Sequence, residues 1–271
     1  MNYSVLKKYW SVVQISWQSG FVYRFNFIMW RVRNVVQLLT LYFLWLAVSG
    51  PKESIFSYSQ AALLTYVLGS SLIRAIVLSV RSIDSQVDIA TGDLNNFLIK
   101  PLNYFVYWAA RDIADKALNI AFAIVELVLL YLILKPPIIF PQHPSTWFLF
   151  ALSVSLATAL FFMFSFIISM TTFWYYQYNG WAQRFLSFVI VESLAGSLFP
   201  LDILPPLFAK ILISLPTAYF IYFPMQIYLE RLGDEEIATG YTVLVFWIIV
   251  LYIIGQFLWQ KGLKVYAAFG R

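Results

Sequence analysis

Residues 104–134 read YFVYWAARDIADKALNIAFAIVELVLLYLIL, a run with two unlike halves. The second half holds one charged side chain, Glu126, whereas the first half holds four: Arg111, Asp112, Asp115 and Lys116. As a helix with a rise of about 1.5 Å per residue, the run is roughly 45 Å long, which exceeds a hydrocarbon core of about 30 Å. We therefore predict that its apolar half crosses a membrane and that its charged half lies in the interface or the cytoplasm.

The composition of the whole chain agrees with an integral membrane protein. Of its 271 residues 61% are hydrophobic, 20% aromatic and 11% charged, whereas a soluble domain averages roughly 45–50% apolar and about 25% charged. The chain has no cysteine and one histidine, His143, which excludes thiolate and histidine zinc sites and disfavours a serine–histidine–aspartate triad. No G-x-x-x-x-G-K-[ST] motif occurs, so the chain has no P-loop of its own, and we expect neither an enzyme site nor a cofactor or metal in it.

The expected fold is all-α, with one transmembrane domain over residues 1–271. Six apolar segments are predicted to cross the membrane, at 25–48, 59–80, 104–134, 146–173, 185–200 and 239–259. Ahead of them, residues 1–22 place apolar side chains at spacings of three and four, the pattern of an amphipathic helix in the headgroup plane. Five prolines punctuate the chain from 200 to 224, which favours broken re-entrant helices over 203–230.

Basic residues set the expected orientation. With both termini in the cytoplasm, 14 of the 18 Lys and Arg residues fall on the inner side and 4 on the outer side, as the positive-inside rule favours. These charges are strung between apolar runs, which does not suggest nucleic-acid binding. Arg31, Arg33 and Arg74 lie near inner span ends and are expected to snorkel to the headgroups. We expect a multi-pass protein of a prokaryotic cytoplasmic membrane.

The longest polar stretch between spans is residues 81–103, and we predict a short cytoplasmic helix within it at 84–98. Its acidic side chains would match a basic groove on a partner, Gly92 permits a sharp turn, and an apolar group follows before Pro101 ends the element. A solvated loop is the alternative interpretation. The residues expected to act in coupling to a partner are Asp84, Asp88, Gly92, Asp93, Phe97, Leu98, Lys100 and Pro101.

Residues 91–102 read TGDLNNFLIKPL and resemble the G-[ED]-L-x-x-x-L-[LI]-[KR]-P-L stretch of ABC-2 type exporter permeases. The in-plane helix, the six spans, the long cytoplasmic segment and the broken helices resemble the same family. The resemblance implies a permease subunit that forms half of a translocation pathway. It also implies that the 84–98 helix sits in a groove of a separate P-loop ATPase.

The same resemblance implies the partners and the cofactors. The ATPase would be present in two copies and would carry ATP and Mg, and a second permease, identical or paralogous, would complete the pathway. Membrane lipid would surround the complex.

Two carboxylates are predicted deep in the spans, Glu126 and Glu192. An ionisable group there costs at least roughly 2.5–3.5 kcal/mol, so each should face protein or a cavity. Contact with a lipophilic cation is one interpretation, and a protonated or hydrogen-bonded packing residue is the other. The candidate pathway also includes an outer constriction formed by Leu198, Phe199, Pro200 and Leu201.

Two other classes of function remain to be weighed. A secondary transporter or channel would use Glu126 and Glu192 as ion or proton sites, but the chain shows no obvious internal repeat and few spans. An intramembrane enzyme is disfavoured because no metalloprotease pattern or catalytic histidine set is present.

Overall fold

The computed structural model describes residues 3–22, 24–50, 54–175 and 189–268. Within these ranges five helices are long and apolar enough to cross a membrane, as expected for an all-α membrane protein. They are α2 (Arg24–Ser49), α3 (Gln60–Val77), α6 (Tyr104–Leu134), α7 (Pro144–Met170) with its extension η2 (Thr171–Phe173), and α11 (Asp234–Ala268). The fifth predicted span, 185–200, lies partly outside the described residues, and its described part is helical over residues 189–194.

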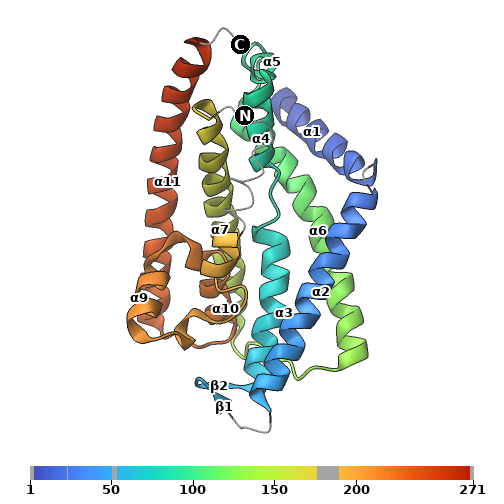
Figure 1. Ribbon diagram of the computed structural model, residues 1–271, viewed down its shortest axis with the longest axis vertical. Coiled ribbons are helices and arrows are strands. Elements are labelled where there is room, and N and C mark those ends of the chain that lie inside the picture. Colours follow the sequence, from blue (N-terminus) through green and yellow to red (C-terminus); the bar gives the residue numbers. More distant parts are fainter. Residues whose placement is uncertain (1–2, 23, 51–53, 176–188, 269–271) are drawn as a thin grey trace.

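The long helices run along the longest axis of the molecule (Figure 1). Helix α3 contacts α2, α6 and α7, and α7 in turn packs against α11. Two short helices, α4 (Ser85–Thr91) and α5 (Leu94–Leu98), lie at one end of the bundle with the last turns of α11 (Figure 1). A hairpin of β1 (Ser54–Ile55) and β2 (Tyr58–Ser59) lies at the other end. We name these the α5 end and the hairpin end.

Local signals in the sequence begin the helices that frame the bundle. Asn103, two residues after Pro101, caps α6 because its Oδ1 accepts hydrogen bonds from the N–H groups of Phe105 and Val106, at 3.0 and 3.1 Å. Ser59 caps α3 in the same way through the N–H of Ala62. The hairpin turn before it places both central residues at positive φ, the geometry of a type I′ turn.

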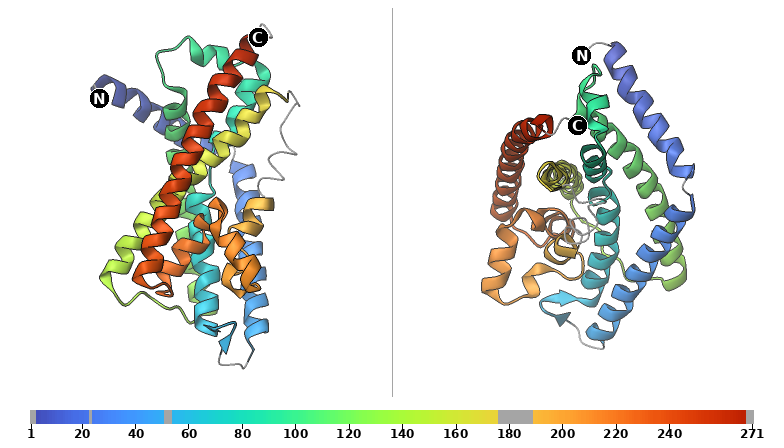
Figure 2. Two further views of the ribbon diagram at one scale, coloured as in Figure 1. Left: turned by 90° about the vertical axis from the view of Figure 1, so that its left-hand side faces the viewer. Right: turned by 45° about the horizontal axis from the view of Figure 1, so that its top comes forward.

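Helix α1 (Tyr3–Val22) packs along the charged half of α6. The backbone N–H of Asn103 donates to the Tyr9 hydroxyl at 2.9 Å, and a Cβ on Gly20 would lie 2.6 Å from Leu118. Figure 2 shows α1 projecting sideways from the bundle at the α5 end. Its location in the headgroup plane stays a prediction.

The proline-rich region is divided into short helices: η3 (Leu201–Ile203), α9 (Pro206–Ser214), η4 (Pro216–Tyr219) and α10 (Tyr222–Tyr228). Residues 217–227 are all buried. Met225 of α10 contacts α3 at Gly69, where a Cβ would lie 2.7 Å from the methionine sulfur. Helix α10 is therefore part of the protein core between α3 and α7.

Candidate functional site

The connection between α3 and α4 is fixed to α7 by two pairs of buried serines. The hydroxyls of Ser82 and Ser165 are 2.7 Å apart, and Ser85 Oγ donates to Ser169 Oγ at 2.7 Å. All four side chains are buried. Because a buried hydroxyl without a partner costs free energy, these pairs set the position of η1 (Ser82–Asp84) and α4 on α7.

The charged half of α6 binds the same connection from its other side. Asp112 Oδ1 accepts from the backbone N–H groups of Arg81, at 2.5 Å, and Ser82, at 2.9 Å. Asp115 Oδ1 pairs with Arg81 Nε at 2.8 Å, and Lys116 Nζ donates to the carbonyl of Ser79. Burial alone would lower the pKa of Arg81, but Asp115 raises it above its ordinary value. These charges therefore hold the chain that leads into α4.

The predicted helix over 84–98 is two helices, because Gly92 between them has φ +88°. A left-handed backbone of this kind favours glycine. Helix α4 and the start of α5 pack on the bundle through Ile89 and Leu94, which are buried against Tyr104 and Tyr266. The predicted sharp turn at Gly92 is thus present, and it separates a docked α4 from a more exposed α5.

The predicted coupling residues divide into two groups. Asp88 accepts a hydrogen bond from the Tyr104 hydroxyl at 3.0 Å, and the Phe97 ring packs on Tyr104. Burial raises the pKa of Asp88 above its ordinary value. Asp84 lies 3.9 Å from Arg81. These three side chains are therefore engaged within the protein rather than offered outward.

The second group of coupling residues is exposed. Leu98, Lys100 and Pro101 lie at the end of α5, which we name the α5 tip together with Ile99, and Asp93 lies at the start of α5. Leu98 is 48% exposed and the neighbouring Ile99 is 83% exposed. Lys100 and Pro101 are exposed beside them, and Asp93 is exposed while accepting from the Thr91 hydroxyl at 2.8 Å. The tip thus joins an apolar group to charged neighbours at the α5 end.

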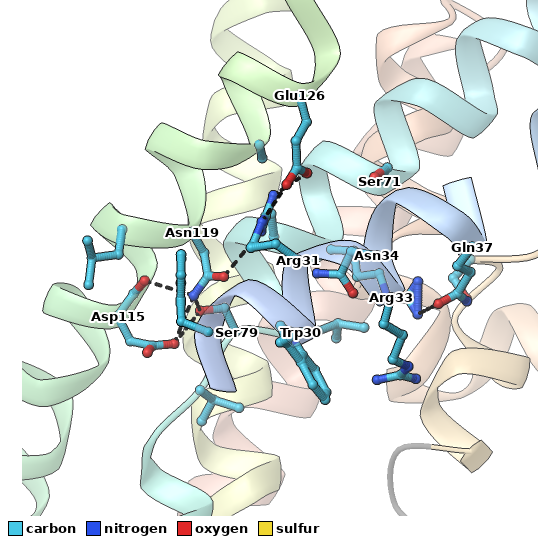
Figure 3. A pocket seen from close by; sticks show the side chains of 18 of the residues that line it. Trp30, Arg31, Arg33, Asn34, Gln37, Ser71, Ser79, Asp115, Asn119 and Glu126 are labelled. Atoms are coloured by element: carbon cyan, nitrogen blue, oxygen red, sulfur yellow. Dashed lines mark hydrogen bonds and ion pairs between the residues drawn. The ribbon is translucent and has the colours of Figure 1, made fainter. Parts of the chain in front are cut away.

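A cavity of about 910 Å³ lies between α1, α2, α3 and α6 (Figure 3). It continues past the α3–α4 connection at Arg81 and Asp84, and residues 189, 192 and 197 complete its wall. Its walls combine serine and amide side chains with apolar ones. Polar residues at helical spacing mark its three long walls: Arg31, Asn34 and Gln37 on α2, Ser70, Ser71 and Arg74 on α3, and Asp115, Asn119 and Glu126 on α6.

Glu126 is paired across this cavity with Arg31. Arg31 Nε donates to Glu126 Oε1 at 2.6 Å, Nη2 donates to Oε2, and Nη1 donates to Asn119 Oδ1 at 3.3 Å (Figure 3). The Arg31 side chain is 8% exposed. The expectation that Arg31 snorkels to the headgroups is therefore wrong, because the carboxylate of α6 lies within reach inside the bundle.

Glu192 is also paired. Arg74 Nη2 donates to Glu192 Oε1 and to Gln37 Oε1, the latter at 2.8 Å, and Arg33 Nη2 lies 3.8 Å from the same Glu192 oxygen. Arg74 thus points to this carboxylate and does not snorkel as expected. Because a guanidinium already holds each glutamate, the interpretation of Glu192 as an open site for a cation loses its basis.

The four residues predicted as a constriction, Leu198 to Leu201, do not line the cavity. Leu201 is fully buried in the core with α10, and the Leu198 carbonyl accepts from Trp45 Nε1 at 3.0 Å. Gly196 just before them has φ +76°, and its carbonyl accepts from the Tyr66 hydroxyl at 2.6 Å. Ser197 is in the cavity wall, and the four residues after it form a turn that these contacts hold outside the cavity.

A polar cluster toward the hairpin end was not predicted. The Tyr58 hydroxyl donates to Asp202, at 2.8 and 2.9 Å to its two oxygens, and Gln226 Nε2 donates to that hydroxyl at 2.5 Å. Arg231 lies 3.6 Å from Asp202, with its guanidinium 3.7 Å above the Tyr58 ring. This cluster ties the hairpin to η3 and α10.

The comparison with known families assigns most of the chain. A sequence profile described as "ABC-2 family transporter protein" matches residues 35–270. No curated protein matches the chain in sequence. The matched range includes the α4–α5 segment and most of the cavity walls, and it leaves out α1.

Proposed function

Because the chain belongs to the ABC-2 family of transporter proteins, we propose that it is the permease subunit of an ATP-driven exporter. It forms half of the translocation pathway, and a second permease, identical or paralogous, forms the other half. Two copies of a separate P-loop ATPase hold ATP and Mg and drive the movement, since this chain carries no P-loop.

The observation that carries this proposal is the attachment of the α4–α5 segment. Its start is bonded to α7 through serines and to α6 through Asp112, whereas its tip exposes Leu98 and Ile99. A solvated loop would need neither the buried anchor nor the apolar tip. A segment that receives force from a partner needs both, because the force must reach the helices without being absorbed by the connection.

The distribution of charge supports a cytoplasmic location of the α5 end. Basic residues gather there, among them Lys7, Lys8, Lys100, Lys261 and Lys264. The described parts nearest both chain ends also lie at this end of the bundle (Figure 1). We infer that both termini are cytoplasmic and that the hairpin end is outside, following the positive-inside rule.

Co-purification tests the coupling role. Asp88 is unsuitable for this purpose because it bonds Tyr104, so the substitutions are placed on the exposed tip as Leu98→Glu with Ile99→Glu. Burial of an aliphatic side chain at an interface is worth roughly 1.5–3 kcal/mol when complete. We therefore expect the ATPase recovered with the tagged permease from native membranes to fall by about tenfold or more.

The matched control is Leu98→Met with Ile99→Met, which keeps the apolar surface and should keep the ATPase bound. Thermal unfolding of all three proteins should agree, because both positions are exposed. Undiminished recovery of the ATPase with the glutamate variant would refute the coupling assignment.

A further inference from the structure

A second hollow lies beside the cavity on the outer surface of the bundle. It is an apolar groove of about 450 Å³ between α1, α2 and α6. Its rim is exposed and hydrophobic, with Phe21 at 53%, Ile28 and Val32 at 51%, and Phe122 at 40% exposure. On a helix that crosses a membrane, such a surface faces lipid chains. The groove therefore fits a hydrocarbon chain.

The groove and the cavity share one wall. Five residues line both: Gly20, Phe27, Arg31, Leu118 and Glu126. The Arg31–Glu126 ion pair thus stands at the boundary between an apolar hollow and a polar one. Each hollow also has a volume within the range of roughly 300–1,000 Å³ that is typical of small-molecule sites.

The polar side of this boundary carries more guanidinium groups than carboxylates. The described residues that line the cavity include five arginines and four acidic residues: Arg31, Arg33, Arg74, Arg81 and Arg111 against Asp84, Asp115, Glu126 and Glu192. Of the three lining arginines on α2 and α3, which are Arg31, Arg33 and Arg74, Arg33 is the least engaged. It lies 3.8 Å from a Glu192 oxygen that Arg74 already binds, its side chain is 49% exposed, and it rests over the Trp30 ring at 4.6 Å.

We propose that the groove and the cavity together bind an anionic amphiphile with a single hydrocarbon chain. The chain lies in the groove, and the anionic head lies in the cavity. There the head pairs with the positive charge of Arg33, which Glu192 does not balance. A cationic head would add to the excess of positive charge, and an anion without a chain would forgo the apolar groove. This inference rests on the proposed function, since it names the class of cargo.

Native mass spectrometry of the full chain in a neutral detergent tests the proposal by counting bound probe molecules. Three probes share a dodecyl chain and differ in the head: dodecyl phosphate, dodecyl phosphocholine and dodecyltrimethylammonium. We expect dodecyl phosphate to bind about tenfold more tightly than the ammonium probe, as one charge-assisted contact supplies. Inorganic phosphate alone should show no binding at the same concentration.

Two substitutions separate the head site from the chain site. Arg33→Gln should remove the preference for phosphate, whereas Arg33→Lys should keep it. Val32→Trp fills the groove and should weaken all three dodecyl probes equally. Its matched control is Val48→Trp on the same helix, which is 46% exposed, lines neither hollow and should leave binding unchanged.

Equal binding of the phosphate and ammonium probes, or a phosphate preference that survives Arg33→Gln, would overturn the proposal. Loss of dodecyl phosphate binding after addition of phosphatidylglycerol would also overturn it, because the groove would then be a site for bilayer lipid. No ATPase is present in this experiment. Its failure therefore leaves the coupling role of the α5 tip to be judged by co-purification alone.

Discussion

The Arg31–Glu126 pair should behave as one energetic unit. Its two side chains are 8% and 19% exposed, and two guanidinium nitrogens donate to the two carboxylate oxygens. Removal of one partner from a buried pair costs about 3–5 kcal/mol, since the other charge is left unpaired. Because the pair is partly exposed, we expect Arg31→Gln and Glu126→Gln each to lower the free energy of unfolding by an amount at the lower end of this range, near 3 kcal/mol.

The double variant Arg31→Gln with Glu126→Gln removes both charges and should cost less than the sum of the two single substitutions. We expect a coupling energy of about 2 kcal/mol or more from the double-mutant cycle. The free energy of unfolding would be measured by reversible denaturation of the full chain in bicelles. Melting temperatures give a parallel measure, at roughly 2–4 °C per kcal/mol for a chain of similar size.

The pair of Arg33 and Glu192 is the internal control. Its atoms are 3.8 Å apart and Arg33 is half exposed, so its coupling energy should stay below about 1 kcal/mol. If the Arg31 and Glu126 substitutions add to within about 0.5 kcal/mol, the two residues do not form the buried pair described here.

Two further substitutions test the packing of the docked segment and of α11. Asp88→Asn should reduce the pH dependence of stability. Burial raises the pKa of Asp88, so the folded protein holds this proton to higher pH than the unfolded chain, and the fall in melting temperature as pH rises from about 4 through the raised pKa should be smaller in Asp88→Asn than in the wild type. Equal slopes in the variant and the wild type would assign the dependence to other groups. Gly240→Ala should destabilise the chain by about 1–3 kcal/mol, because a Cβ there would lie 2.1 Å from the buried Phe223 ring, whereas Gly255→Ala in the same helix has its nearest neighbour at 3.9 Å and should be neutral or stabilising. Equal melting temperatures for the two alanine variants would contradict this packing.

The long helices could be predicted because their signals are local. The run from Tyr104 to Leu134 is apolar, begins after a proline and an asparagine cap, and is helical over that range. Helix α11 is longer than the predicted 239–259, since three acidic residues stabilise its first turn and Tyr266 packs beyond the apolar run. The segment 84–98 contains two helices, and Gly92 was a correct signal for the turn between them.

The ion pairs could not be predicted in the same way. Arg31 and Glu126 are 95 positions apart, and Arg74 and Glu192 are 118 apart, so the pairing depends on how the helices pack. A partial signal was present in the polar residues at helical spacing on α2, α3 and α6. Such stripes within apolar spans indicate that these faces meet around a common cavity, although the spacing does not say which arginine takes which carboxylate.

The anchoring of the α3–α4 connection has a mechanical consequence. Helix α6 is unbroken over 31 residues, or roughly 46 Å, and the connection is bonded to it near its first third and to α7 by the paired serines. Under the proposed coupling, the helix acts as a lever, with the force of the ATPase applied at the α5 end. A tilt of about 5° displaces its far end by about 4 Å over that length, which is larger than the gap of about 0.5–1 Å between surfaces within which packed side chains stay in contact.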